Sequence, residues 1–116
     1  MAPLESKLYR IKIIPGQEEV AKEWLAFLKE HQAAALETLK NEQVYLEGHF
    51  TAMEHDGMYV YLFMAARNIE EANQIAAQSI NPLDHTHFDY MRRCADRSAS
   101  AIMDAFCLLD NLESHR

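Results

Sequence analysis

The sequence predicts an α+β fold in which helices cover one face of a single antiparallel β-sheet. Three observations lead to this prediction. Residues 8–14 and 44–54 alternate apolar and polar side chains with the period of a strand. Residues 17–41 instead carry apolar side chains at the three- and four-residue steps of a helix. An Asp-Gly pair separates the second alternating run from an apolar run at 58–64, which is typical of a β-hairpin.

The first strand and the first helix follow directly from these periods. Alternation over residues 8–14 places Tyr9, Ile11 and Ile13 on one face of the strand, and a Pro-Gly pair ends it. The helix predicted over residues 17–41 has a broad apolar stripe, so we expect it to pack on a sheet. The stripe consists of Val20, Trp24, Phe27, Leu28, Ala35 and Leu39.

The first strand of the hairpin has two unlike faces. Val44, Leu46 and Phe50 form an apolar face, which we expect to join the core. The opposite face combines an aromatic ring, a carboxylate, an imidazole and a hydroxyl group. These belong to Tyr45, Glu47, His49 and Thr51. Such a set is unusual for a face that only meets water, and it is the most informative feature of the chain.

Helix signals dominate the second half of the chain. Asn68 can cap a short helix over residues 69–79. The Asn81-Pro82 pair must interrupt this helix, because proline lacks a backbone donor and restricts the residue before it. We therefore expect two separate helices between the hairpin and the C-terminal segment.

The last helix and the last strand complete the predicted order. Asp84 is a natural N-cap for a helix over about residues 85–100. Residues 105–112 are predicted as a short strand, although residues 101–104 could simply continue the helix. The resulting βαββαβ order is the ferredoxin-like plan, with one antiparallel sheet and helices on one of its faces.

This plan leaves the other face of the sheet without a cover. We expect that face to carry Arg10, Lys12, Tyr45, Glu47, His49 and Thr51, together with either Tyr59, Tyr61 and Phe63 or Val60, Leu62 and Met64. Either set from the third strand is too apolar for an open face, and large exposed apolar patches usually mark interfaces. The sequence therefore predicts a homodimer that forms through its sheet faces.

Length and composition limit the class of protein. The 116 residues predict a single domain over 1–116 with an ordered core over about 7–112, and 49% hydrophobic with 25% charged residues is typical of a soluble globular protein. No run is long and apolar enough to span a bilayer, and no signal peptide is evident, so we expect a cytoplasmic protein. The two cysteines are expected to be free thiols. A net charge of −7 argues against nucleic acid as a partner.

Four motifs resemble those of a known family. They are Ile13-x-Pro15-Gly16-Gln17-Glu18; Trp24-Leu25-x-Phe27-Leu28; Tyr45-x-Glu47 with Phe50, Glu54 and Tyr59-x-Tyr61; and Asn81-Pro82-Leu83-Asp84-x-x-His87-x-x-Tyr90-x-x-x-Cys94. Over about residues 7–112 the chain resembles a small bacterial family of unknown function whose members are similar to dimeric α+β-barrel proteins. That wider superfamily includes cofactor-independent monooxygenases, haem-degrading enzymes, isomerases and mutarotases. The chain shows the catalytic pattern of none of them, so the resemblance implies a fold and a pocket only.

The histidines give the candidate chemistry. Glu47 and His49 lie two residues apart on one strand face, so both could reach one ligand as a general acid–base pair. His85 and His87 would point about 200° apart on a helix, and only His87 can therefore face a pocket. A metal could be held by His49, Glu47 and His87, but no spacing demands it, and no metal or cofactor site is predicted. The chain has no glycine-rich phosphate loop.

We expect a cleft between sheet and helices that binds or transforms a small molecule. The residues expected to line it are Tyr45, Glu47, His49, Tyr59, Tyr61 and His87. His49 would be the general base, Glu47 would orient it, and Tyr45 or Tyr61 would donate a hydrogen bond to a substrate oxygen. The sequence leaves open whether there is a reaction. Two alternatives remain, a non-catalytic protein-interaction module that uses the polar sheet face and a divalent-metal protein.

Overall fold

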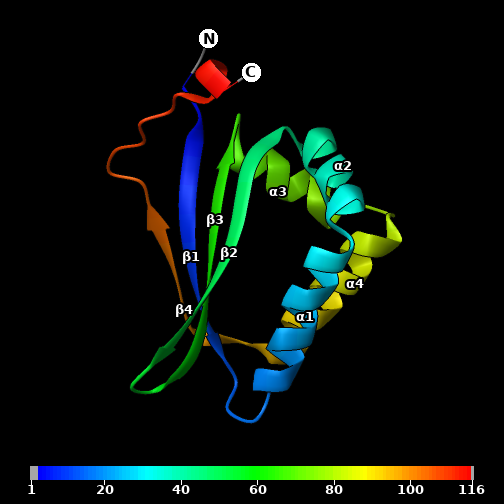
Figure 1. Cartoon of the computed structure of the whole chain (residues 1–116), viewed down its shortest axis with the longest axis vertical. Coiled ribbons are helices and arrows are strands. Elements are labelled where there is room, and N and C mark those ends of the chain that lie inside the picture. Colours follow the sequence, from blue (N-terminus) through cyan, green and yellow to red (C-terminus); the bar gives the residue numbers. More distant parts are fainter. Residues whose placement is uncertain (1–2, 116) are drawn as a thin grey trace.

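Four β-strands and four α-helices make up the regular structure of residues 3–115, which the computed structural model describes. They are β1 (Glu5–Ile13), α1 (Glu18–Glu30), α2 (Gln32–Glu42), β2 (Val44–Glu54), β3 (Gly57–Ala66), α3 (Ile69–Ala77), α4 (Pro82–Cys94) and β4 (Ala95–Asp104). The α-helices lie on one side of the sheet and leave its other side uncovered (Figure 1). This order and layering confirm the predicted ferredoxin-like α+β fold. No helix of the described residues is long and apolar enough to cross a membrane.

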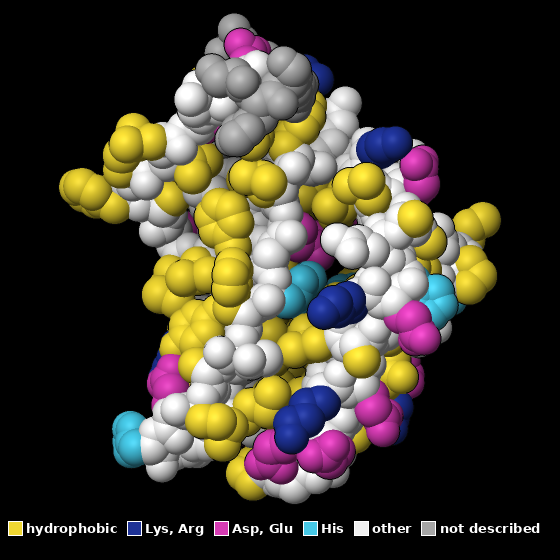
Figure 2. Space-filling model, in the orientation of Figure 1, with side chains coloured by type: hydrophobic (Ala, Val, Ile, Leu, Met, Phe, Trp, Pro, Cys, Tyr) yellow, Lys and Arg dark blue, Asp and Glu magenta, His cyan; other side chains and the backbone are white. Residues whose placement is uncertain are grey.

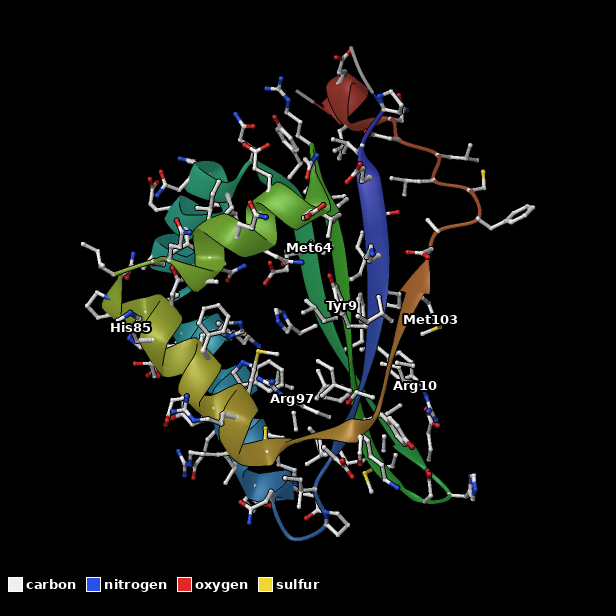
Figure 3. All side chains as sticks on the ribbon, turned by 180° about the vertical axis from the view of Figure 1, so that it is seen from behind. Tyr9, Arg10, Met64, His85, Arg97 and Met103 are labelled. Atoms are coloured by element: carbon white, nitrogen blue, oxygen red, sulfur yellow. The ribbon has the colours of Figure 1, made fainter. Side chains whose placement is uncertain are left out.

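The sheet has the strand order β2-β3-β1-β4, and every neighbouring pair is antiparallel. Tyr9 of β1 is opposite Leu62 of β3, so these two side chains share the face that the helices cover. Tyr9 and Met64 point from the sheet toward the helices, whereas Arg10 and Met103 point to the uncovered side (Figure 3). The alternation thus separates a helix-facing surface from an outer surface along every strand.

The main core lies between the lower part of the sheet and α1 and α4. Trp24 of α1 and Cys94 at the end of α4 are fully buried against Ile11, Ile13 and Val60 of the sheet. Burial of large apolar side chains is the main stabilising contribution in a domain of this size. A second, smaller cluster lies under α2 and α3, and the space between the two clusters positions the site described below.

The helix predicted over residues 17–41 is divided in the structure. His31, with φ −107° and ψ 32°, ends α1 and precedes α2. The Phe27 carbonyl accepts a hydrogen bond from the His31 backbone N–H, and the His31 ring nitrogen Nδ1 also lies 3.0 Å from it. A side chain that competes for a helical carbonyl favours a break there. As a result, α1 packs along α4 while α2 turns toward α3 and β2.

The last strand lies earlier in the chain than the sequence predicts. The helix expected over 85–100 ends at Cys94, β4 follows at once, and residues 105–111 form neither helix nor strand. The prediction of a strand over 105–112 is therefore wrong. β4 is rich in small and polar residues, which have low strand propensity. It is a strand because the free edge of β1 supplies its hydrogen-bonding partner.

The two faces of β2 are the reverse of the prediction. Leu46 and Phe50, expected in the core, are 44% and 61% exposed on the outer face. Glu47 and His49 face the helices instead. Val44 is nevertheless buried, because the register shifts between Val44 and Leu46 and changes the alternation there. Glu47 and His49 are thus on an inner surface of the protein, whereas Tyr45 and Thr51 of the same predicted face are exposed.

The outer face of β3 carries the aromatic set, which decides between the two alternatives. Tyr61 is opposite Arg10 and Tyr59 is opposite Lys12, so both tyrosines share the outer face with these basic residues. Val60 and Leu62 face the helices and are buried. Arg10 and Lys12 therefore lie where the sequence predicts them, on the uncovered side of the sheet.

Candidate functional site

A cavity of about 1010 Å³ lies between the sheet and the helices. Its walls are largely apolar and include Tyr9, Leu28, Leu39, Leu62, Met64 and Met91. Polar side chains from α2, β2 and α4 reach into it. Figure 2 shows a histidine side chain at the bottom of a hollow between the two layers. An apolar cavity with a few convergent polar groups is the usual form of a small-molecule site.

Glu47 and His49 reach the cavity together from β2. Their side chains are 18% and 15% exposed, and the distance from His49 Nε2 to Glu47 Oε1 is 3.7 Å. That distance is too long for a hydrogen bond. His49 Nε2 is buried and has no hydrogen-bond partner among the described residues. A buried polar nitrogen without a partner is costly, so this atom is available to a ligand.

His87 joins this pair from α4, as the sequence predicts, and is held by Trp24. The indole N–H of Trp24 donates a hydrogen bond of 2.9 Å to His87 Nδ1. Because Nδ1 is the acceptor, the proton of the neutral imidazole is on Nε2. The ring centres of His49 and His87 are 6.2 Å apart, and those of Trp24 and His49 are 5.6 Å apart with the two rings nearly perpendicular. The sequence identified Trp24 only as part of an apolar stripe.

Two further carboxyl groups line the same cavity, and the sequence reasoning missed their role. Glu42, the last residue of α2, is 8% exposed, and Asp84 in the first turn of α4 is 7% exposed. Asp84 accepts a hydrogen bond of 2.5 Å from the Ser79 hydroxyl. It is not the N-cap that the sequence predicts, because Asn81 caps α4 by accepting from the Leu83 N–H. No sequence pattern links residues this far apart.

Burial changes the protonation of these groups. It raises the pKa of Glu47 to about 7, with a further contribution from the charge of Asp84. Burial raises the pKa of Glu42 to about 7 as well, assisted by Asp84 and Glu47. Burial lowers the pKa of His49 to about 4, with a smaller contribution from His87, and lowers the pKa of His87 to about 4. At neutral pH both histidines are therefore uncharged, and Glu47 and His49 do not form an ion pair.

The three tyrosines expected in the cleft do not line the cavity. Tyr45 is 45% exposed. Tyr59 donates a hydrogen bond of 2.9 Å to Asp56, and the Tyr61 hydroxyl donates one to Glu54. The Arg10 guanidinium stacks 3.9 Å from the centre of the Tyr59 ring, on the outer face. The hydroxyl groups of Tyr59 and Tyr61 thus form hydrogen bonds outside the cavity, and none of the three tyrosines lines it. The prediction that Tyr45, Tyr59 and Tyr61 line the cleft is therefore wrong.

His85 also lies outside the cavity. It is exposed on α4, and its Nε2 is 2.8 Å from the Ser79 carbonyl oxygen. Figure 3 places it at the end of the helix layer that is far from the sheet. Among the residues that the structure describes, no group of three His, Cys, Asp or Glu side chains is arranged to hold a metal ion.

Comparison with solved structures supports the fold. A provisionally assigned antibiotic biosynthesis monooxygenase from Bacteroides thetaiotaomicron is 19% identical with a TM-score of 0.60, over 95% of this chain and 94% of that one. A dimeric ferredoxin-like protein of unknown function from Bacteroides fragilis is 11% identical with a TM-score of 0.60, over 88% and 94%. A variant of SnoaB, a cofactor-independent oxygenase from Streptomyces nogalater, is 13% identical with a TM-score of 0.53, over 96% and 99%. At these identities the similarity shows the fold alone.

Sequence comparison identifies the family. No curated protein matches the chain. A family model does match it, over residues 4–113, and is described as a family of unknown function, DUF6176. This range includes every side chain that lines the cavity. The chain therefore belongs to the family of unknown function DUF6176.

Proposed function

We propose that the protein binds a small organic molecule in the cavity and that Glu47 and His49 exchange protons or hydrogen bonds with it. The observation that carries this proposal is the His49 Nε2 atom, which is buried beside Glu47 and has no partner among the described residues. The largely apolar side chains around this atom offer it no hydrogen-bonding group, so a ligand in the cavity could be its partner.

The protonation of the pair favours Glu47 as the proton-transferring group. A general acid or base is most effective when its pKa lies near the working pH, and the pKa of Glu47 is raised to about 7. His49, whose pKa is lowered to about 4, is a weak base and acts as a neutral hydrogen-bonding group. These roles are the reverse of those expected from the sequence, where His49 is the base. His87 presents its Nε2–H to the same space because Trp24 occupies Nδ1.

Binding is testable with a fragment library and a matched pair of variants. We expect fragments to shift the amide signals of α2, β2 and α4 around the cavity in two-dimensional NMR spectra. His49→Ala should weaken these fragments about tenfold or more, because it removes the hydrogen-bonding nitrogen. His55→Ala, at an exposed turn, is the control and should leave binding unchanged. Fragments that perturb only the outer face, or bind both variants equally, would contradict the proposal.

The outer sheet face supports a homodimer as the second part of the proposal. Leu46 and Phe50 on β2 are 44% and 61% exposed, and Met103 on β4 is 38% exposed. Exposed apolar surface of this extent usually marks an interface. The Bacteroides fragilis protein with the same fold is dimeric. The competing interaction module would have used a polar sheet face, but that face of β2 lies inside the molecule, so a second copy is the partner we propose.

Light scattering on a sizing column tests the dimer. We expect a mass of two chains, each of 13.4 kDa, for the native protein. Phe50→Asp should give a single-chain mass, because a charge would be buried without a partner at the interface. Ile80→Asp, at an exposed position between α3 and α4, should remain dimeric. A native protein with the mass of one chain would sink the dimer.

The cytoplasm is the compartment we propose for this activity. Cys94 and Cys107 are both free thiols, and Cys107 is exposed. An exposed thiol is stable in a reducing compartment and is readily oxidised elsewhere.

A further inference from the structure

We propose that the ligand is an organic cation, whose ammonium or guanidinium group binds among Glu42, Glu47 and Asp84, which all line the cavity. The inference rests on the proposed function, since it uses the same cavity, and it adds the chemical class of the ligand. It places the charged end of the molecule against the carboxyl groups and the apolar end against the hydrophobic wall.

Glu42 is the first observation that points to a ligand. Its side chain lines the cavity, is more than nine-tenths buried, and has neither a hydrogen bond nor an ion pair within the described residues. A carboxyl group that is largely shielded from water and has no protein partner would gain a charge-assisted hydrogen bond from a cationic donor. Asp84, the other buried carboxyl group at the cavity, accepts one hydrogen bond, from Ser79, which leaves acceptor capacity for a further donor.

The second observation is the charge of the surrounding groups. Three separate elements, α2, β2 and α4, bring one carboxyl group each to the cavity. They lie close enough for the charge of Asp84 to raise the pKa of both glutamates. The neighbouring histidines, His49 and His87, are uncharged at neutral pH and cannot balance this charge.

Two basic residues also line the cavity. Lys29 of α1 and Arg97 of β4 line it, but both are exposed, and neither forms an ion pair with a described carboxylate. Glu42, Glu47 and Asp84 thus form no ion pair with a lysine or arginine among the described residues. A ligand cation would supply such a partner.

The apolar wall distinguishes an organic cation from a metal ion. Leu28, Leu39, Leu62, Met64 and Phe88 line the same space as the carboxyl groups. A hydrated divalent ion gains nothing from such a surface, whereas the hydrocarbon part of an amine buries apolar area against it. The described residues also contain no arrangement of three side chains that could hold a metal.

Three probes with one skeleton test the charge preference: 2-phenylethylamine, 2-phenylethanol and phenylacetate. Trp24 is the only tryptophan of the chain and lies beside His49 and His87, so its fluorescence reports binding. We expect the ammonium to bind about tenfold or more tightly than the alcohol, because charge-assisted hydrogen bonds are stronger than neutral ones. We expect phenylacetate to bind more weakly than either.

Glutamine variants of Glu42 and Glu47 test whether these carboxyl groups cause the tighter binding of the amine. Glu42→Gln keeps the shape of the side chain and should remove most of the difference between amine and alcohol. Glu47→Gln should do the same. Glu23→Gln, on the exposed surface of α1, should leave it unchanged. The affinity for the amine should also increase from about pH 6 to about pH 8, since the two glutamates must lose their protons to pair with a cation.

The outcomes separate this inference from the proposed function. If the alcohol or phenylacetate binds as tightly as the amine, and His49→Ala weakens it, the cavity binds small molecules but the cation preference is wrong. If the amine preference survives both glutamine variants, the cationic group binds elsewhere and the inference is overturned. If none of the three probes changes the Trp24 signal, the inference also fails, and the fragment screen alone decides the proposed function.

Discussion

Replacing both Glu42 and Glu47 by glutamine is expected to make the free energy of unfolding rise steeply from about pH 4 to about pH 6.5. In the native protein, opposing contributions should make the free energy of unfolding change much less over the same pH interval. The difference arises because the cavity contains two kinds of buried titratable group whose pKa values shift in opposite directions.

Burial of the two histidines makes the protein less stable as the pH falls. Burial lowers the pKa of His49 and His87 from 6.5 to about 4, so between these values the unfolded chain binds more protons than the folded one. Stability therefore decreases as the pH falls through this interval. A shift of this size corresponds to a loss on the order of 3 kcal/mol for each histidine.

The glutamates act in the opposite sense. The pKa of Glu42 and of Glu47 is raised from 4.5 to about 7, so between these values the folded protein binds more protons than the unfolded chain. Stability then decreases as the pH rises. Over most of the interval this effect offsets that of the histidines. Glutamine does not titrate, so the double variant should show the histidine effect alone.

Urea unfolding at a series of pH values, followed by circular dichroism, measures this difference directly. Groups outside the cavity, such as Asp96, titrate equally in both proteins and do not affect the comparison. Parallel curves for the native protein and the double variant would show that Glu42 and Glu47 ionise at ordinary pH values and are not buried as described.

Trp24→Ala is expected to cause the largest loss of stability of any single substitution near the site. Trp24 is fully buried in the main core, and removing a large aromatic side chain from a core costs about 3–5 kcal/mol. The substitution also removes the donor to His87 Nδ1, which would leave that buried nitrogen without a partner. A domain has a total stability of about 5–15 kcal/mol, so much of it would be lost.

Two controls separate the contributions of volume and hydrogen bonding. Trp24→Phe retains an aromatic ring but removes the indole N–H, and should cost less than the alanine variant. Leu36→Ala, on a side chain that is 54% exposed, should change the free energy of unfolding by no more than about 0.5 kcal/mol. Unfolding is followed by circular dichroism, because the two Trp24 variants lack the tryptophan whose fluorescence would otherwise report it. A loss for Trp24→Ala no larger than that for Leu36→Ala would refute its place in the core.

Local patterns of the sequence were sufficient to predict the layers of the fold. The hairpin, β1 and the short helix capped by Asn68 follow from period and turn chemistry, and each of these acts within a few residues. β4 could not be predicted in this way. Its small, polar residues are extended because they pair with β1, a contact that propensity does not encode.

The inner face of β2 was harder to predict, because hydrophobicity alone gives the opposite orientation. Leu46 and Phe50 are on the outer face, and Glu47 and His49 are inside. Binary patterning assumes that the apolar face seeks the core. Such a rule fails where polar side chains line a cavity, as Glu47 and His49 do here.

The composition of the site also depended on contacts between distant elements. Glu47, His49 and His87 could be selected from residue type and spacing. Glu42 and Trp24 could not, because their roles arise from packing α1 and α2 over β2 and α4. Buried polar groups of this kind reduce stability and are retained where they bind or react.

NMR titration of the Glu47 carboxyl group and the His49 imidazole tests the central claim most directly, which is that burial in the cavity raises the pKa of Glu47 to about 7 and keeps His49 uncharged at neutral pH. Assignment by Glu47→Gln and His49→Ala identifies the two signals. We expect the Glu47 carboxyl carbon to titrate with a pKa of about 7 and the His49 ring to remain neutral down to about pH 4. Titration of Glu47 near 4.5 and of His49 near 6.5, the ordinary values of these groups, would show that water fills the site and would contradict the account.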